Sequence, residues 1–428
     1  MNTIFALASG VGRAGVSVIR VSGGDATRAL TSFGCVVPAE RYATVQKLLL
    51  PDGTVLDEAV TLFFKGPRSF TGEDTVELQC HGSLAVVRKV LAHLSEQDGF
   101  RLAEAGEFTR RALEHDRLDL TQVEGLSDLI EAETEAQRVQ AQRVLSGAIG
   151  QKVEQWRTKL IRAAALIEAT LDFADEEVPV DVSPEVTELL SSLVRDLEAE
   201  EGGVHHAEAV RRGFRIAILG EPNVGKSTLL NALAGREAAI TSSIAGTTRD
   251  IIEVRLEIGG IPVTLLDTAG LRDSDDEIEA VGVARAMRAA AEADLRVFLS
   301  LDGSAPGEMC QVGDIIALAK QDEAGVYKNG VSGKTGAGLE WLEAQIFEVL
   351  EPRVSQVGIA TLERHRIAIV SALTHLRAAQ DLLGSSVGAD DLVAEELRSA
   401  QRALEVLTGR IDVENLLSEI FSTFCLGK

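Results

Sequence analysis

The chain has 428 residues, of which 45% are hydrophobic and 4% aromatic, and its formal net charge is −24. This length allows two or three domains with full cores, and the chain has no apolar run long enough to cross a membrane. The acidic charge gives no support for a nucleic-acid partner, which would have to bind through a local basic patch.

The start of the chain and its cysteines both favour the cytoplasm. The N-terminus lacks the basic segment of a secretory signal, and the apolar stretch from Ile4 to Ala8 is more typical of a strand. The cysteines lack the spacing of zinc sites or of a disulfide framework. They are Cys35, Cys80, Cys310 and Cys425.

Residues 1–117 have the pattern of a mixed α/β domain. We expect a strand over Val16–Val21 and a hairpin of Val45–Leu50 with Val55–Phe64 around the turn at 51–53. A further strand over Thr75–Gln79 precedes a helix over 83–95.

The pattern becomes helical from residue 118. Apolar residues recur every three or four positions, which predicts one long amphipathic helix, bent near Gly147 and Gly150. These residues are Val144, Ile149, Val153, Trp156, Leu160, Ala164, Ile167 and Leu171. A second helix is expected over about 184–198. Helical periodicity returns over 362–383, 392–407 and 411–421.

Between these helical parts, residues 211–351 alternate strands and helices, which predicts a parallel sheet. The simplest interpretation is one helical domain interrupted by an inserted nucleotide-binding domain. The predicted boundaries are 1–117, 118–210, 211–351 and 352–428.

A phosphate-binding motif opens the inserted domain. Residues 220–227 read Gly-Glu-Pro-Asn-Val-Gly-Lys-Ser, after an apolar strand (Arg215–Leu219) and before a helix (Thr228–Ala234). In this setting the loop N–H groups converge on the β-phosphate. Lys226 would bridge the β- and γ-phosphates, and Ser227 would bind Mg²⁺.

Two further motifs complete the γ-phosphate site of a switch GTPase. Thr248 is placed to bind Mg²⁺ and to sense the γ-phosphate. The sequence Asp267-Thr268-Ala269-Gly270 ends a second apolar strand. Asp267 would hold the same ion through water, and the Gly270 N–H would contact the γ-phosphate.

The guanine-recognition motif departs from the usual Asn-Lys-x-Asp, because residues 319–322 are Ala-Lys-Gln-Asp. Asp322 can still accept hydrogen bonds from guanine N1 and N2. Alanine removes contacts that brace the loop, so weaker guanine affinity is expected rather than lost specificity. Ser332-Gly333-Lys334 fits the remaining base-contact loop. About thirty residues separate Asp302 from this loop, which suggests a trimmed domain.

Leu271 follows Gly270, where many regulatory GTPases have a glutamine that orients the attacking water. Leucine cannot do this, so other groups must orient the water and supply positive charge. Asn223 offers a neutral oxygen suited to a monovalent cation. Nearby acidic residues are candidates for orienting the water: Asp273, Asp275, Asp276, Glu277 and Glu279.

The whole chain resembles the MnmE (TrmE) family of tRNA-modification GTPases. The resemblance covers essentially all residues and depends on motifs near both ends and in the middle. They lie at 12–16, 19–23, 69–74, 106–109, 118–120, 172–177, 244–250 and 424–428.

This resemblance implies a fold, a reaction and partners. The implied fold is multidomain α+β and α/β, with a folate-binding and dimerising N-terminal α/β domain, a helical domain and an inserted P-loop GTPase domain with a mainly parallel sheet. The implied partners are a second copy of the chain, a flavoprotein of the MnmG type that completes a heterotetramer, and tRNA. The implied reaction adds a carboxymethylaminomethyl or aminomethyl group to the wobble uridine, driven by potassium-activated GTP hydrolysis.

The resemblance also assigns site residues. Potassium would be held by Asn223, Ser242, Ile244 and Thr247, and magnesium by Ser227 and Thr248. Glu279 would orient the water and Lys226 would also be catalytic. The wider nucleotide and ion set adds Val224, Gly225, Thr228, Ser243, Ala245, Gly246, Asp267, Thr268, Ala269, Gly270 and Asp322. The 5-formyltetrahydrofolate pocket would use Arg20, Glu77, Arg117 and Lys428, with arginine at 117 where the family usually has lysine.

Two other functions remain open from the sequence. One is a regulatory ribosome-assembly GTPase without modification activity, which the N-terminal motifs and the C-terminal tail disfavour. The other is a folate-dependent one-carbon enzyme with a vestigial GTPase domain, which would show negligible GTP turnover.

Overall fold

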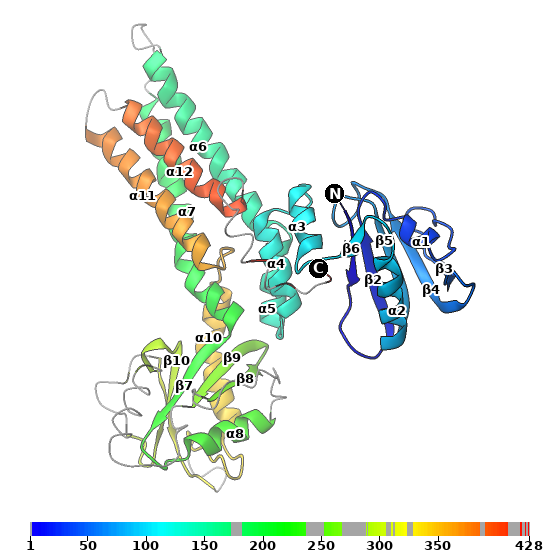
Figure 1. The fold of residues 1–428 in the computed structure, drawn as a ribbon. Coiled ribbons are helices and arrows are strands. Elements are labelled where there is room, and N and C mark those ends of the chain that lie inside the picture. Colours follow the sequence, from blue (N-terminus) through cyan, green and yellow to red (C-terminus); the bar gives the residue numbers. More distant parts are fainter. Residues whose placement is uncertain are drawn as a thin grey trace, which may run out of the picture. The chain divides into compact units, whose positions relative to one another are not determined.

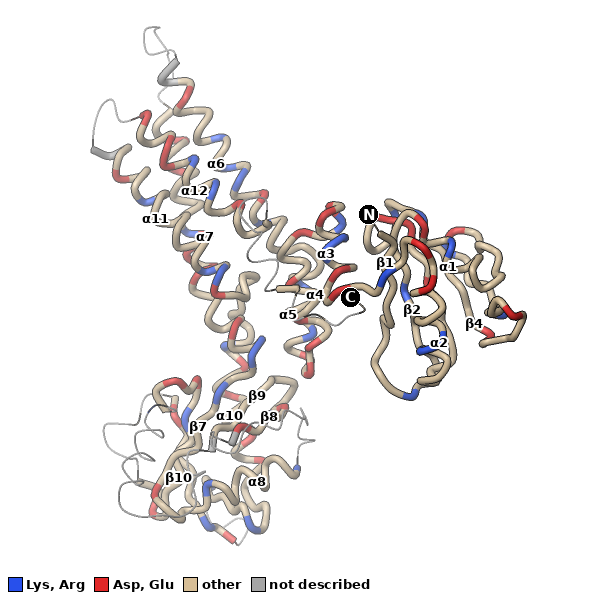
Figure 2. The backbone as a smooth tube through the Cα atoms, in the orientation of Figure 1, with Lys and Arg blue, Asp and Glu red and all other residues tan. Residues whose placement is uncertain are grey.

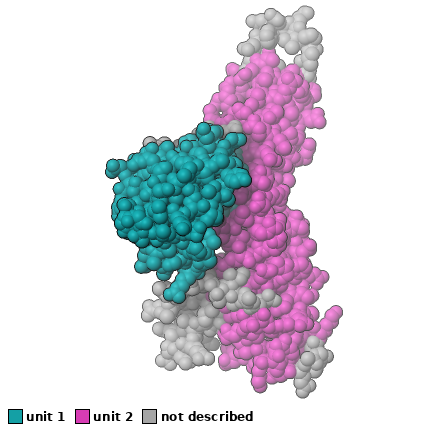
Figure 3. Space-filling view, turned by 90° about the vertical axis from the view of Figure 1, so that its right-hand side faces the viewer, with its two compact units in different colours: residues 1–127, 408–428 teal, residues 128–407 magenta. Residues whose placement is uncertain are grey.

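The computed structural model describes the chain except for residues 1, 173–181, 237–251, 268–287, 289, 305–309, 311–312, 323–327, 386–389, 410–419, 422–423, 425–426 and 428. The chain forms two compact units, one of residues 1–127 with 408–428 and one of residues 128–407 (Figure 3). Within the described ranges, every helix is too short or too polar to span a bilayer.

The first unit contains a six-stranded sheet in the order β3-β4-β5-β2-β1-β6 (Figure 1). β1 and β6 pair in parallel, and the other neighbours are antiparallel. The strands are β1 (Thr3–Leu7), β2 (Ala14–Ser22), β3 (Thr44–Leu49), β4 (Val55–Phe64), β5 (Thr75–Gly82) and β6 (Phe100–Leu102). The predicted strands near residues 4–8, 16–21 and 75–79 and the hairpin of β3 with β4 are confirmed.

Alternating side chains explain how this sheet forms a core. In β5, Val76, Leu78 and Cys80 are buried on one face, as the two-residue period of a strand requires. They pack with Ile19 of the neighbouring strand β2 and with Phe5 of β1. The helices are α1 (Arg28–Thr31), α2 (Leu84–Ser95), which confirms the helix predicted there, and α3 (Glu107–Glu114). α4 (Leu120–Glu131) follows them and runs across the boundary between the units.

The second unit contains a helical bundle with one large apolar core. Its long helices are α6 (Ala148–Asp172), α7 (Ser183–Arg212), α11 (Glu363–Ser385) and α12 (Asp390–Thr408). Charged residues of both signs are interspersed along these helices (Figure 2). Arginines of one helix pair with glutamates of another, as in Arg398–Glu168 at 2.9 Å and Arg377–Glu198 at 2.6 Å.

Two helix predictions need correction. The helix expected from Val144 onward is broken, because Gly147 has a φ of 87° and separates α5 (Glu135–Leu145) from α6. α7 continues far beyond the predicted end near residue 198. Its extension buries Val204, Ala207 and Val210, and Gly203 allows close packing, since a Cβ there would lie 2.7 Å from the Gly358 nitrogen.

The same unit contains a five-stranded sheet in the order β11-β10-β7-β9-β8. All neighbours are parallel except β8 and β9, so the predicted multidomain fold with a mainly parallel sheet is confirmed. The strands are β7 (Phe214–Gly220), β8 (Ile252–Ile258), β9 (Ile261–Asp267), β10 (Leu295–Ser300) and β11 (Ile315–Leu318). The helices α8 (Lys226–Arg236) and α10 (Leu339–Ser355) pack on its apolar core.

Candidate functional site

The phosphate-binding loop lies between the end of β7 and the start of α8. Gly220 has a φ of 147°, and a Cβ at this position would collide with the Leu299 carbonyl of β10, so glycine is required. Gly225 has a φ of 113° just before the helix begins. The buried Val224 anchors the loop in the core of the sheet, where its side chain is 2% exposed.

Lys226 and Asn223 occupy distinct positions in this loop. The Lys226 Nζ donates to the carbonyl oxygens of Gly220 at 2.8 Å and Glu221 at 3.0 Å, which holds the ammonium over the loop. Asn223 is exposed with a left-handed φ of 59°, a conformation that asparagine tolerates. Ser227 and Thr228 are exposed in the first turn of α8, and the N-terminal end of a helix favours an anion.

Parallel strand order brings Asp267 next to this loop. β9 pairs with β7 in parallel, and Asp267 is in register with Ile218, two residues before the loop begins. Strands of one direction end at the same edge of a sheet, which is where doubly wound folds bind ligands. The backbone of Asp267 therefore ends β9 beside the phosphate loop, as the motif predicts.

Several predicted residues lie outside the described part of the chain. Among residues 237–251 these are Ser242, Ser243, Ile244, Ala245, Gly246, Thr247 and Thr248. Among residues 268–287 they are Thr268, Ala269, Gly270 and Glu279. Lys428 also lies outside it.

The loop predicted to recognise the base leaves β11 at the same edge of the sheet. Ala319 is 3% exposed, and its N–H donates to the Ser300 carbonyl of β10 at 2.8 Å. Asp322 accepts a 2.7 Å hydrogen bond from the hydroxyl of Ser332, in the loop predicted as the second base contact. That loop packs on the start of α8, because a Cβ at Gly333 would lie 2.6 Å from the Leu229 nitrogen.

A second group of predicted residues lies in the first unit. Arg20 of β2 is in register with Glu77 of β5, and its Nε and Nη2 donate to Glu77 Oε1 at 3.0 and 2.9 Å. The guanidinium carbon lies 5.2 Å from the ring centroid of Phe70 and 5.8 Å from that of Phe108. Such distances allow cation–π attraction, which the sequence prediction did not include.

Arg117 is exposed just after α3. A Cβ at Gly72 would approach its Cγ to 3.4 Å, so Arg117 lies against the loop that contains Phe70. Across the described residues, no hydrogen bond or ion pair joins its side chain to Arg20 or Glu77.

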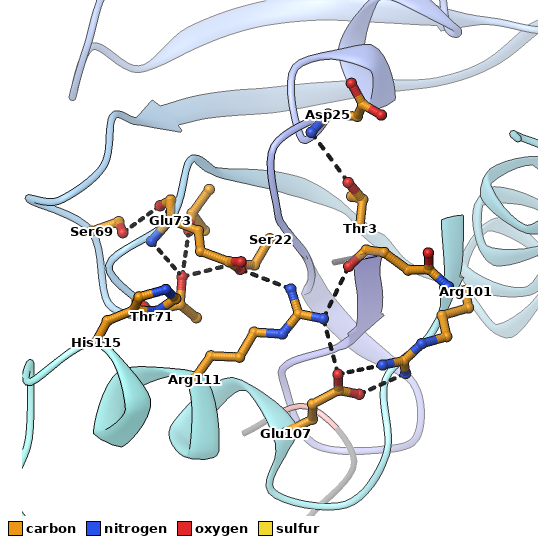
Figure 4. A network of polar contacts seen from close by, with 12 residues as sticks. Thr3, Ser22, Asp25, Ser69, Thr71, Glu73, Arg101, Glu107, Arg111 and His115 are labelled. Carbon is orange, nitrogen blue, oxygen red and sulfur yellow. Dashed lines mark hydrogen bonds and ion pairs between the residues drawn. The ribbon is translucent and has the colours of Figure 1, made fainter. Parts of the chain in front are cut away.

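A polar network beside Arg20 was also missed by the sequence prediction. It contains Ser22, Glu73, Glu107 and Arg111 (Figure 4). Glu73 and Glu107 lie within motifs quoted above, 69–74 and 106–109, and these motifs were the available signal.

A hollow of about 520 Å³ in the second unit contains none of the predicted residues. It lies among residues 128–141, the end of α7 and the strands β8 and β9. The candidate functional residues of the described chain therefore lie at the edge of the five-stranded sheet and around Arg20.

Comparison with protein-family models gives two matches that together span nearly the whole chain. The model described as GTP-binding protein TrmE N-terminus matches residues 3–117, and the MnmE helical domain model matches residues 120–425. The second model alone covers more than half of the chain.

Full-length relatives also match this family along the whole chain. The chain is 60% identical to the tRNA modification GTPase MnmE of Roseobacter denitrificans, and it is 56% identical to the protein of this name from Ruegeria pomeroyi. Each comparison covers 100% of both chains.

Proposed function

This chain belongs to the MnmE (TrmE) family of tRNA modification GTPases, and we propose that its GTP hydrolysis is activated by potassium and drives modification of the wobble uridine. Membership makes the chain a GTP hydrolase and implies that it binds GTP with Mg²⁺. The observation that most supports potassium activation is Asn223, exposed in the phosphate loop beside Lys226. Leu271 strengthens the case, because it replaces the usual glutamine.

Potassium would supply the positive charge that the transition state needs. Charge grows on the bridging and γ-phosphate oxygens as the phosphoanhydride breaks. We propose that Asn223, Ser242, Ile244 and Thr247 hold the ion. Neutral oxygens of this kind suit a monovalent cation better than a set of carboxylates would.

The other parts of the site have separate roles. Ser227 and Thr248 would ligate magnesium, with Asp267 acting through water. Lys226 would leave the carbonyls of Gly220 and Glu221 to bridge the β- and γ-phosphates.

The other predicted residues complete the proposed GTP site. Glu279 would orient the attacking water, and Asp322 would accept from guanine N1 and N2. The backbone around the phosphates would come from Val224, Gly225, Thr228, Ser243, Ala245, Gly246, Thr268, Ala269 and Gly270.

The residues around Arg20 fit a reduced folate such as 5-formyltetrahydrofolate. A guanidinium suits the carboxylates of such a ligand, a glutamate suits the N–H edge of its pterin, and aromatic faces suit its flat ring. Arg20, Glu77 and Phe70 provide these groups close together. We include Arg117 and Lys428 in the proposed pocket.

We further propose the assembly in which these sites act. Two chains would pair through residues 1–117 and bind a flavoprotein of the MnmG type, forming a cytoplasmic heterotetramer that acts on tRNA. Residues 118–210 and 352–428 would form the helical domain around the GTPase domain at 211–351. The product would carry a carboxymethylaminomethyl or aminomethyl group on the wobble uridine.

Mass spectrometry of wobble nucleosides tests this function. Cells lacking the chain should lose the modified uridine, wild type should restore it, and Lys226→Ala should not. Unchanged nucleosides in the deleted cells, with accumulation of ribosomal precursors, would instead support the ribosome-assembly alternative.

A further inference from the structure

A buried arginine joins the two segments that carry the aromatic rings beside Arg20. Arg111 lies in α3 and its side chain is 4% exposed. Its Nη1 donates to Glu73 Oε2 at 2.8 Å, and its Nη2 donates to Glu107 Oε1 at 3.0 Å and to the Asn2 carbonyl at 3.0 Å (Figure 4). Two carboxylates thus compensate the charge of one buried guanidinium, the arrangement that burial of an ion requires.

Glu73 fastens the loop that contains Phe70. Its Oε2 accepts from the Ser22 hydroxyl of β2 at 2.9 Å as well as from Arg111. The same loop is tied by Thr71, whose hydroxyl lies 2.7 Å from that of Ser22 and whose carbonyl lies 2.8 Å from His115 Nδ1. The conformation of this loop therefore depends on contacts with both β2 and the end of α3.

Glu107 fastens the first turn of α3, where Phe108 is fully buried. It accepts from Arg101 at 2.6 and 2.7 Å and from the Glu104 N–H at 2.9 Å. Burial raises the pKa of Glu107, but the hydrogen bonds from Arg101, Glu104 and Arg111 outweigh this effect and lower the pKa to about 2. Arg111 therefore has an ionised partner on its own helix.

The two rings belong to one apolar cluster. Phe70 packs against the buried cluster that Phe108 forms with Ile4, Ala6 and Ala103. Both rings lie close to the Arg20 guanidinium, at centroid distances of 5.2 and 5.8 Å. A shift of either segment would change the surroundings of Arg20, because an arginine side chain is long and is held here by its neighbours.

We propose that Arg111 is a positioning residue for the reduced-folate site. Through Glu73 it holds the loop of Phe70, and through Glu107 it holds the turn of Phe108, so that both rings stay against Arg20. This role rests on the proposed function, since it presumes that Arg20 contacts the folate.

The test measures 5-formyltetrahydrofolate binding by isothermal titration calorimetry on the full-length chain. Arg111→Gln should weaken binding about tenfold, the range of coupling between residues that share contacts, and should leave GTP turnover unchanged. Arg111→Lys, which keeps the charge, should recover part of the affinity. Arg88→Gln, an exposed arginine on α2 of the same unit, should bind as wild type does.

A double-mutant cycle separates positioning from general damage. If Arg111 acts through the rings, Arg111→Gln should lower the folate affinity by less than about twofold in a chain that already has Phe70→Leu. If the double variant loses folate affinity by the product of the two single losses, the proposal is overturned. So would Arg111→Gln binding as tightly as wild type.

Two outcomes separate a failure of the proposed role of Arg111 from a failure of the proposed folate site. A wild-type chain that does not bind the folate would refute the proposed site and this role with it. If Arg111→Gln does not fold, Glu73→Gln replaces it, because the amide keeps the shape of the carboxylate. Wild-type affinity in Glu73→Gln would then overturn the role of Arg111 alone, and a loss of about threefold would support it.

Discussion

The hydroxyl of Ser332 donates a 2.7 Å hydrogen bond to the carboxylate of Asp322, which joins the two loops expected to recognise guanine. Ser332 is 1% exposed, and its oxygen also accepts from the N–H groups of Lys334 and Thr335 at 3.2 and 3.1 Å. The chain has Ala319 where asparagine usually braces this region. The bond between Ser332 and Asp322 supplies a brace from the opposite loop.

Removing this hydroxyl should weaken GTP binding. Ser332→Ala leaves Asp322 without one donor, and a hydrogen bond to a charged group contributes about 1.5–3 kcal/mol, so affinity should fall about tenfold or more. Fluorescence titration with a labelled GTP analogue measures the change. Ser355→Ala, at an exposed serine of α10, is the control, and equal affinity in the two variants would refute the brace.

Glu279→Ala should slow GTP hydrolysis by about 10²-fold or more, the range for a positioned acid–base group, while nucleotide binding stays near normal. Single-turnover hydrolysis and a binding titration separate the two effects. Glu277→Ala, from the same acidic run, is the matched control. Unchanged turnover in Glu279→Ala would remove this residue from the mechanism.

Arg20→Ala should abolish measurable binding of 5-formyltetrahydrofolate. The variant loses the guanidinium and leaves Glu77 without its partner. Arg28→Ala, which removes an exposed arginine paired with Asp25, should bind normally. A wild-type chain with no affinity for the folate would favour a ribosome-assembly role, since such a factor has no reason to hold this ligand.

Stability of the first unit should depend on pH through Glu107. Because its pKa is lowered from 4.5 to about 2 in the folded chain, the stabilisation is complete above pH 4.5 and is lost as the pH falls toward 2. Thermal unfolding between pH 6 and pH 2.5 should therefore show a steeper decline for wild type than for Glu107→Gln. Parallel curves for the two proteins would show that Glu107 does not contribute this dependence.

Local patterns were sufficient to predict much of the fold. The strand before the phosphate loop, the helix after it and the hairpin of β3 with β4 follow from periodicity and turn residues that act within a few positions. The length of α7 did not follow in this way. Its second half is stabilised by distant contacts, such as the close approach of Gly203 to Gly358, which a local pattern does not contain.

The same distinction between local patterns and distant contacts applies to the candidate site. The places of Lys226 and Ser227 at the start of α8 and of Asp267 at the end of β9 were predictable, because their motifs are contiguous and parallel strands end together. Phe70 and Phe108 beside Arg20 were not, because three separate segments bring them together. Arg111 was missed for the same reason, since its partners Glu73 and Asn2 are remote in sequence.

GTP turnover in potassium and in sodium tests the central claim most directly. With ionic strength held constant, replacing sodium by potassium should raise the turnover number on the order of tenfold or more, because the ion offsets charge that develops in the transition state. Asn223→Ala should lose most of this activation while still binding GTP. Equal turnover of the wild-type chain in the two salts would contradict potassium activation.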